Sequence, residues 1–518
     1  MSLGYAEKLS YRDASFLGKL GAAEKFDAQD EVEAKVKELA ELIRNSKHMV
    51  VYTGAGISTS CGIPDFRGPN GIWTLQSTGK PIPQATCSFA QARPSYTHMA
   101  LKALVDAGKV HYIVSQNVDC LHLRSGIPRR QLAELHGNCF REVCPKCGAE
   151  YVRDFELETV GLKSTGRRCS VAGCEGRLKD SVLDWEDALP VDEVAVADRH
   201  SKEADLALCL GTSLQIVPAR NMPFKCIPGG GKVVIVNLQA TPRDKKAALV
   251  IHAKADEVMR GVMRTLNLDV RPYVRIDRLV VAHSLKHSPT GSNRRWVLSL
   301  RSSHGPKGPL QFVKHAKVTF LSAEHRVELL TGPKFELKGS DKSDAAFEDL
   351  LVDVEFVEGT AARHVTLDYR LHLDPDSEST EQINTSEDLR TMVEEASETV
   401  LVTSVRQDRG ASLGIQWQTE YAIITDVVDH RSGSDARLGS AGSSARIARG
   451  TGSEEVAAAR VDCDLIGKVE GGRKTDAVCE SAEAKTGGER IGTAAASKRL
   501  GADSKRKHDE LNRIRIPA

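Results

Sequence analysis

Apolar positions along this chain follow two different periods, and the change falls near residue 268. Up to that point, short apolar runs alternate with segments whose apolar positions recur at helical spacing. The first run, Met49–Tyr52, leads into a glycine turn, which predicts a buried parallel strand followed by a loop. The other predicted strands are Val110–Ser115, Asp205–Leu210 and Lys232–Leu238, and the helical patterns are Asp30–Lys47, Tyr96–Asp106 and Asp256–Leu266. Strands that alternate with helices predict a doubly wound, Rossmann-like parallel sheet of the α/β class.

Beyond residue 268, apolar and polar residues alternate with a period of two. The alternation is clearest in Val352–Phe356 and Val365–Leu373, and it predicts strands with one buried face. We therefore expect an antiparallel β-sandwich over residues 269–375. Residues 376–518 are rich in Ser, Ala, Gly and charged side chains, with one apolar island at Ile415–Val428, and predict a mostly disordered tail. The expected parts are an N-terminal extension (1–29), an α/β domain (30–268), the sandwich and the tail.

Composition narrows the class of protein. Lys and Arg number 71 against 70 for Asp and Glu among 518 residues, so the net charge of +1 argues against a uniformly basic nucleic-acid-binding surface. No stretch approaches the roughly 18 apolar residues of a transmembrane helix, and charged residues interrupt the first 27 positions. We therefore expect a soluble intracellular protein without a signal peptide. In that setting the 12 Cys are better explained as metal ligands or free thiols than as disulfides.

Four cysteines form the most specific motif. Cys144 and Cys147 have two residues between them, Cys169 and Cys174 have four, and 21 residues separate the two pairs. Each short turn can direct two sulfurs toward one point, as a closed tetrahedral zinc site requires. We expect one structural zinc ion in a small module inserted at about residues 139–182, where it would stabilise a segment with little core of its own. The alternative is four unrelated buried thiols.

The glycine turn after the first strand is a weaker signal. In Gly54–Thr59 (GAGIST), small residues would let backbone N–H groups approach a pyrophosphate at a helix N-terminus. The usual dinucleotide fingerprint has a third glycine where this chain has Thr59, which argues against an ordinary dehydrogenase. The motif alone is equally consistent with a tight loop.

Polar side chains follow the strand that ends at Ser115. Gln116, Asn117 and Asp119 lie at the edge where an open parallel sheet binds its ligand, and their side chains can bond ribose hydroxyls or a carboxamide. Turn formation alone would also explain Asn and Asp at these positions. His136, eight residues before the first predicted zinc ligand, titrates near neutral pH. It is a candidate general base, or a polar side chain satisfied within the fold.

Taken together, these motifs resemble one family. GAGIST, GIPDFRGPNGIW, QNVDCLH, ELHGN, the four cysteines, LGTSLQIVP and VIVNLQ occur in the order of the sirtuins, the NAD-dependent protein-lysine deacylases, over about residues 30–268. GIPDFRGPNGIW, DWEDALP and LGTSLQIVPARN look most like the class IV nuclear subgroup, and MSLGYAEKLSYRD is similar to its plant members. Two positions depart from the family pattern: Cys120 stands where many sirtuins have glycine, and Ala255 where close relatives have valine. We expect the Cys120 thiol to be inert.

The resemblance implies roles for individual residues. NAD would lie between the Rossmann-like domain and the zinc module. His136 would be the catalytic base that acts through the ribose hydroxyls, Asn117 would position the ribose, and Asp119 would hold the nicotinamide carboxamide. The full set of implied NAD-binding residues is Ala55, Gly56, Thr59, Asp65, Phe66, Arg67, Trp73, Gln116, Asp119, Gly211, Thr212, Ser213, Asn237, Gln239 and Ala255.

The implied reaction is deacylation of lysine with consumption of NAD. The acyl oxygen would attack the anomeric carbon and displace nicotinamide, and the products would be free lysine, nicotinamide and O-acyl-ADP-ribose. An apolar tunnel would admit a neutral acyl-lysine and disfavour a charged lysine. The expected partners are acylated lysine peptides, histone tails in particular. Two alternatives remain open: protein mono-ADP-ribosyl transfer, and a non-catalytic chromatin-binding scaffold.

Less is implied for the rest of the chain. The strands between residues 270 and 375 faintly resemble YEATS-type β-sandwiches, which include acyl-lysine readers, but without a convincing aromatic cage a structural or interaction domain is the better expectation. The last 29 residues, from Arg490, hold eight Lys or Arg and three Asp or Glu. This basic segment fits nuclear import, contact with DNA phosphates, or a solvated tail. With the subgroup resemblance, we expect a nuclear protein with no membrane partner.

Overall fold

The computed structural model describes residues 9, 17–82, 87–185, 187–287, 294–305, 307–322, 326–342, 345–360, 362–375, 399–408 and 415–430. Residues 399–408 are described by their backbone alone. The basic segment from Arg490 lies outside the described residues, and so does most of the predicted tail. Within the described part of the chain, no helix is both long enough and apolar enough to cross a bilayer.

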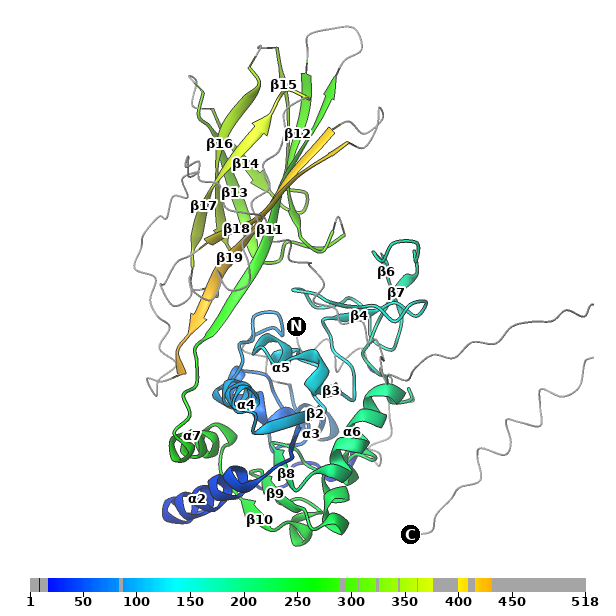
Figure 1. The fold of residues 1–518 in the computed structure, drawn as a ribbon, viewed down its shortest axis with the longest axis vertical. Coiled ribbons are helices and arrows are strands. Elements are labelled where there is room, and N and C mark those ends of the chain that lie inside the picture. Colours follow the sequence, from blue (N-terminus) through cyan, green and yellow to red (C-terminus); the bar gives the residue numbers. More distant parts are fainter. Residues whose placement is uncertain are drawn as a thin grey trace, which may run out of the picture. The chain divides into compact units, whose positions relative to one another are not determined.

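A six-stranded parallel sheet forms the centre of the N-terminal part (Figure 1). Its strand order is β10-β9-β8-β1-β2-β3, and every neighbouring pair is parallel. The strands are β1 (Met49–Thr53), β2 (Val110–Ser115), β3 (Leu132–Glu134), β8 (Leu206–Leu210), β9 (Lys232–Val236) and β10 (Leu249–Ile251). The doubly wound sheet predicted from the sequence is confirmed. Its order changes direction at β1, the kind of position at which open α/β sheets bind their ligands.

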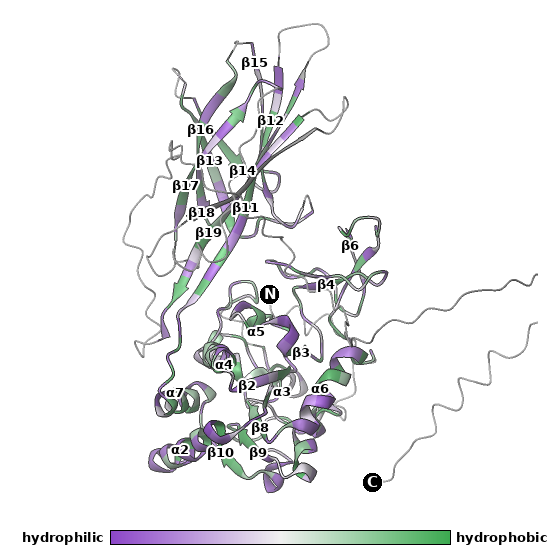
Figure 2. Cartoon of the chain, viewed as in Figure 1, coloured by the Kyte–Doolittle hydropathy of each residue, from purple (hydrophilic) through white to green (hydrophobic). Residues whose placement is uncertain are grey.

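Helices cover both faces of this sheet, which explains why its strands are continuous apolar runs. Met49 and Val51 pack into one core with the helices α2, α4 and α7, whereas Val50 and Tyr52 pack into a second core with α6. Figure 2 shows β8 and β9 in the green of apolar residues, while α2, α6 and α7 carry purple, hydrophilic stretches. The helices are α2 (Gln29–Asn45), α3 (Ile72–Ser77), α4 (Tyr96–Asp106), α5 (Leu121–Arg124), α6 (Val191–Glu203) and α7 (Ala255–Leu266).

The N-terminal extension is bound to the α/β domain where it is described. The backbone N–H of Lys25 donates to the carbonyl of Leu238 at 2.7 Å, and that of Asp27 donates to the carbonyl of His252 at 2.9 Å. Lys25 and Asp27 therefore lie along the segments that follow β9 and β10.

A small antiparallel sheet is inserted between β3 and α6. Its order is β5-β4-β7-β6, and its strands are β4 (Arg141–Val143), β5 (Glu150–Val152), β6 (Ser164–Arg168) and β7 (Arg177–Asp180). Three of the four predicted zinc ligands are buried in its small core with Leu178. Its strands span residues 141–180.

Two antiparallel sheets follow, and they share one apolar core. Their orders are β15-β12-β11-β19-β18 and β14-β13-β16-β17. The strands are β11 (Tyr273–His287), β12 (Arg294–Ser302), β13 (Val313–Phe320), β14 (Val327–Thr331), β15 (Glu336–Asp341), β16 (Phe347–Phe356), β17 (His364–His372), β18 (Thr399–Asp408) and β19 (Ile415–Val428). The sheets therefore extend beyond residue 375, where we expected a disordered tail to begin. The apolar island Ile415–Val428 is β19, which pairs with β11, a strand distant in sequence that local patterning cannot identify.

Candidate functional site

A pocket of about 420 Å³ lies at the carboxyl ends of β1, β2, β8 and β9. Its walls come from loops that are far apart in the sequence and that the parallel sheet brings to one edge. The predicted site residues that line it are Ala55, Gly56, Asp65, Phe66, Arg67, Trp73, Gln116, Asn117, Asp119, His136, Gly211, Thr212, Ser213, Asn237 and Gln239. The volume lies within the range typical of small-molecule sites, roughly 300–1,000 Å³.

Two of the predicted site residues do not line this pocket. Thr59 is exposed, and its hydroxyl donates to the carbonyl of Gly56 at 3.1 Å. Ala255 is the first residue of α7 and packs against the apolar core. The pocket also contains Ser58 and Trp185, which are not among the implied NAD-binding residues. Trp185 belongs to the DWEDALP motif, so that motif could have drawn attention to it.

Glycines allow the loops after β1 and β8 to touch through their backbones. A Cβ on Gly56 would lie 2.7 Å from the Cα of Gly211, and a Cβ on Gly54 would lie 2.8 Å from the Gly211 carbonyl oxygen. The N–H of Gly56 donates to that same oxygen at 2.9 Å. Gly211 itself has a φ of 56°, which favours glycine. The small residues of the first loop are therefore required by packing as well as by any ligand.

Replacing Gly56 with alanine should lower the free energy of unfolding by about 1–3 kcal/mol, because the new methyl group meets backbone atoms that cannot rotate away. Chemical denaturation of the full chain would measure the change. Gly229→Ala is the matched control, since a Cβ there has no neighbouring atom within 4 Å. Equal stability of the two variants would contradict the packing role of Gly56.

The polar side chains after β2 form a connected set. The hydroxyl of Ser58 donates to one oxygen of Asp119 at 2.7 Å, and the N–H of Leu121 donates to the other at 2.9 Å. The amide of Asn117 donates to the carbonyl of Gly54 at 3.1 Å. The segment after β2 is thus fastened to the glycine loop after β1, and Asn117 and Asp119 are held in fixed positions in the pocket.

His136 has a defined tautomer. Its Nδ1 lies 2.9 Å from the carbonyl oxygen of Gln116, which can only accept a hydrogen bond. Nδ1 therefore carries the proton, and Nε2 has a free lone pair. Burial lowers the pKa of His136, and the positive charge of Arg67 acts in the same direction, so the imidazole is neutral at pH 7. Gln116 is itself held in place, because its side-chain amide donates to the hydroxyl of Thr212 at 2.9 Å.

Aromatic rings and one arginine form another wall of the pocket. The ring of Trp73 lies 4.6 Å from that of Phe66 and 5.0 Å from that of Trp185, centroid to centroid. The guanidinium of Arg67 lies 4.5 Å from the Trp73 ring centroid, and its Nε donates to the carbonyl of Leu17 at 2.9 Å. Burial lowers the pKa of Arg67 to about 10, which leaves it charged at neutral pH. Among the described residues, its buried Nη2 has no hydrogen-bond partner, so a donor remains for a ligand.

Cys120 adopts a backbone conformation that favours glycine, with a φ of 66°. This geometry accounts for the glycine that many sirtuins have at this position. Burial raises the pKa of the Cys120 thiol to about 12, so the side chain stays protonated. The expectation of an inert thiol agrees with this environment.

The four predicted zinc ligands converge on one point. Their sulfur atoms all lie within 4.8 Å of one another, and the distances from Cys144 to Cys174 and from Cys147 to Cys169 are both 3.6 Å. Sulfurs bound at about 2.3 Å to a tetrahedral zinc ion lie roughly 3.8 Å apart. The Tyr151 hydroxyl lies 3.1 Å from the sulfur of Cys169 and can donate to it as a thiolate. The donor set therefore fits one structural zinc ion, as predicted, and it leaves no position open for substrate.

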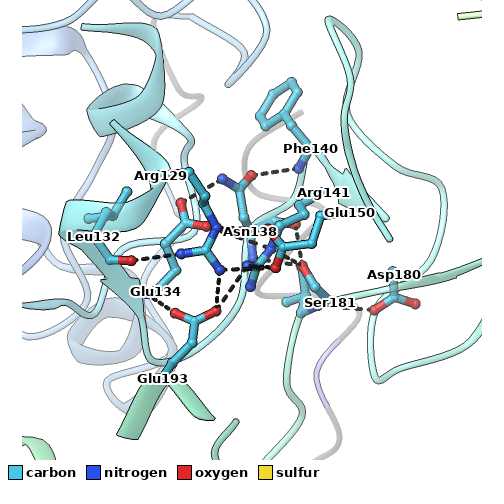
Figure 3. A network of polar contacts seen from close by, with 11 residues as sticks. Arg129, Leu132, Glu134, Asn138, Phe140, Arg141, Glu150, Asp180, Ser181 and Glu193 are labelled. Atoms are coloured by element: carbon cyan, nitrogen blue, oxygen red, sulfur yellow. Dashed lines mark hydrogen bonds and ion pairs between the residues drawn. The ribbon is translucent and has the colours of Figure 1, made fainter. Parts of the chain in front are cut away.

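A network of ion pairs connects the zinc module to the sheet and to α6 (Figure 3). Arg141 of β4 is 3% exposed and contacts Glu134 of β3, Glu150 of β5 and Glu193 of α6. Arg129 contacts the same Glu150 and Glu193 at 2.9 and 2.6 Å. Removing one partner of a buried ion pair leaves an uncompensated charge, which lowers the free energy of unfolding by about 3–5 kcal/mol. The network therefore fixes the module against the end of the sheet.

The same region holds the segment that carries His136. The N–H of Leu183, which follows β7, donates to the carbonyl of His136 at 3.1 Å. Asn138 donates to Glu134 at 2.6 Å and accepts from the N–H of Phe140 at 2.8 Å. A Cβ on Gly137 would lie 1.8 Å from the carbonyl oxygen of Ser181, so this close contact requires glycine. The position of His136 thus depends on how the zinc module is folded.

Comparison with known proteins places this site in a family. Residues 81–218 match a family model described as the Sir2 family. An Arabidopsis thaliana protein named NAD-dependent protein deacetylase SRT1 is 54% identical over 69% of this chain and 76% of its own length. The chain is a member of the Sir2 family. The resemblance drawn from the motifs is therefore confirmed.

Other relatives of this Sir2 protein carry similar names. The Drosophila melanogaster NAD-dependent protein deacetylase Sirt6 is 49% identical over 53% of this chain and 87% of its own length. The human NAD-dependent protein deacetylase sirtuin-7 is 41% identical over 54% of this chain and 73% of its own length. A solved structure described as Sir2-p53 peptide-NAD+ is 33% identical, with a TM-score of 0.36, over 44% of this chain and 97% of that one. The identity is higher with the plant protein than with the two animal proteins.

Proposed function

We propose that this Sir2 protein is an NAD-dependent protein-lysine deacylase that releases nicotinamide and O-acyl-ADP-ribose. The observation that carries the proposal is the state of His136, a neutral imidazole with a free Nε2 in the same pocket as the glycine loop. The relatives named above are NAD-dependent protein deacetylases, which supports the same activity.

The residues of the pocket fit NAD as the co-substrate. The charged Arg67 offers an unused donor, which suits an anionic or carbonyl group. When bound, NAD supplies the sugar carbon that loses nicotinamide and gains the acyl oxygen of lysine. In the mechanism we infer, His136 accepts the proton of a ribose hydroxyl at Nε2. Asn117, fixed by its bond to Gly54, orients the ribose.

The apolar wall of the pocket suits an acylated lysine. Phe66, Trp73 and Trp185 exclude water that would otherwise compete for the reacting carbon. A neutral acyl-lysine enters such a wall at little cost, whereas a charged lysine loses its hydration. Selectivity for the modified side chain follows from this difference.

The proposed substrates are acylated histone tails, and the proposed location is the nucleus. The resemblance to the nuclear subgroup supports both. The Lys and Arg residues of the basic segment from Arg490 suit nuclear import or contact with DNA phosphates.

We expect an acetylated histone peptide to lose its acyl group only when NAD is present, with nicotinamide released in equal amount. The unmodified peptide should release none, because no acyl oxygen is available to displace nicotinamide. Mass spectrometry of the peptide, with an assay for nicotinamide, measures both. A peptide that gains ADP-ribose would replace this function with mono-ADP-ribosyl transfer. If the folded, zinc-loaded protein turns over no acyl-peptide, the scaffold function would replace the deacylase function.

A further inference from the structure

A second group of side chains of types that bind metals lies at the amino end of β1. The pocket lies at the carboxyl end of the same strand. Within the described residues, two groups of three or more His, Cys, Asp or Glu bring one ligand atom each to within 4.8 Å of one another. One is the set of four cysteines, and the other is His48, His200 and Glu203. His48 immediately precedes β1, whereas the pocket begins after the last residue of that strand. The length of β1 therefore separates this cluster from the catalytic pocket.

The donor atoms of this cluster have nearly the spacing of metal ligands. His48 Nε2 lies 3.0 Å from His200 Nδ1. This contact is a hydrogen bond between the two rings, and a zinc ion would replace it: two nitrogens bound at 2.0–2.1 Å to tetrahedral zinc lie roughly 3.4 Å apart, so both rings must move apart and turn toward the ion. His200 and Glu203 are three residues apart on α6 and share one face of that helix. One turn of helix therefore supplies two of the three ligands.

The two imidazoles are held in place before any metal binds. The N–H of His48 donates to the carboxylate of Asp205 at 3.1 Å, and the N–H of Asp205 donates to the His48 carbonyl at 3.2 Å. The His48 ring stacks on His111 with centroids 4.6 Å apart. The His200 ring stacks on Tyr112 at 4.4 Å, with the planes inclined by 7°. Both rings are thus fixed, which reduces the entropy lost when they bind an ion.

The donor atoms of the cluster also suit a cation. His48 Nε2 and His200 Nδ1 share one hydrogen bond, so one of them carries a proton, which moves to the other nitrogen of its ring when an ion binds. The carboxylate of Glu203 is exposed and adds one negative charge. Two neutral imidazoles and one carboxylate form a ligand set that zinc accepts and that magnesium and calcium disfavour.

We propose that His48, His200 and Glu203 bind a second zinc ion, with water in the remaining coordination position. The ion would join the residue before β1 to the last turn of α6. The amino-terminal turn of that helix carries Glu193, a member of the network that fixes the zinc module. Zinc binding at this site should therefore stabilise the α/β domain, and this effect does not depend on NAD.

Zinc titration of the full chain tests the proposal. Protein that retains zinc on its four cysteines is titrated in the presence of a competing chromophoric chelator. The wild type should bind one further zinc ion per chain. Loss of an outer-shell partner alone weakens metal binding by about 10–100-fold. Glu203→Gln and His200→Ala should therefore raise Kd by at least about 10-fold.

Matched controls separate this site from general surface binding. Glu38→Gln changes an exposed glutamate on α2, and His364→Ala changes an exposed histidine on β17. Both should bind zinc as the wild type does. Absence of a further equivalent in the wild type, or an equal Kd in all variants, would overturn the proposal.

A second measurement covers the case in which His200→Ala does not fold. Glu203 is exposed, so Glu203→Gln retains the packing of α6. Saturating zinc should raise the Tm of the wild type by about 4 °C or more and leave that of Glu203→Gln nearly unchanged. An equal shift in both proteins would also overturn the proposal.

Discussion

Replacing His136 with alanine should lower kcat for NAD-dependent deacylation by about 10²–10⁴-fold, the usual contribution of a positioned general base. The variant loses the one side chain that we place as proton acceptor, while the pocket walls remain. Release of nicotinamide with an acetylated histone peptide measures the effect. KM for NAD should change little, because Arg67, Asn117 and the glycine loop are untouched.

A structural role for His136 would give a different result. Among the described residues, the side chain hydrogen-bonds to the Gln116 carbonyl alone, so its loss should leave zinc content and Tm close to those of the wild type. The pH profile supplies a further criterion. Because burial lowers the pKa of His136, the wild type should lose activity on acidification at a lower pH than an ordinary imidazole would require. A variant with near-normal kcat, or with a Tm that collapses, would contradict the assignment of the base.

The sequence predicts the central sheet well because the local pattern and the buried surroundings agree. Four of the six parallel strands are apolar runs that end in polar turns, and α4 begins and ends at the residues expected from its periodicity. The two remaining strands, β3 and β10, have three residues each, too few for a pattern. The β-rich region shows the other limit. β19 is held in the sheet by pairing with β11, and a local sequence pattern cannot predict pairing with a strand about 140 positions away.

The site could be predicted where a motif stands at a strand end. The glycine loop, Asn117 and Asp119 each follow a strand. The four cysteines can be predicted to lie close together because each pair is only a few residues apart in the sequence. The contacts of Arg141 could not be inferred, because its glutamate partners lie on three different elements. The cluster of His48, His200 and Glu203 could not be inferred either, since 151 residues separate His48 from His200.

Replacing Cys144 with serine should remove the structural zinc ion and destabilise the module that it holds. Cys144 is fully buried, and its sulfur is one of the four donors that converge there among the described residues. Loss of a structural metal belongs to the most destabilising class of change, about 4 kcal/mol or more. At about 2–4 °C per kcal/mol, Tm of the α/β domain should fall by about 10 °C. Metal analysis and thermal unfolding measure the two effects.

Activity should fall in the same variant, although no zinc ligand lines the pocket. The segment after β7 bonds to the backbone of His136 through Leu183 and continues to Trp185, which lies in the aromatic wall. Unfolding of the module therefore displaces the base and the wall together. Cys226→Ser is the matched control, because it replaces a buried cysteine outside the module whose sulfur bonds to the Pro223 carbonyl, and a serine hydroxyl can keep that bond. Full activity and an unchanged Tm in zinc-free Cys144→Ser would refute the coupling, because the position of His136 would then not require the folded module.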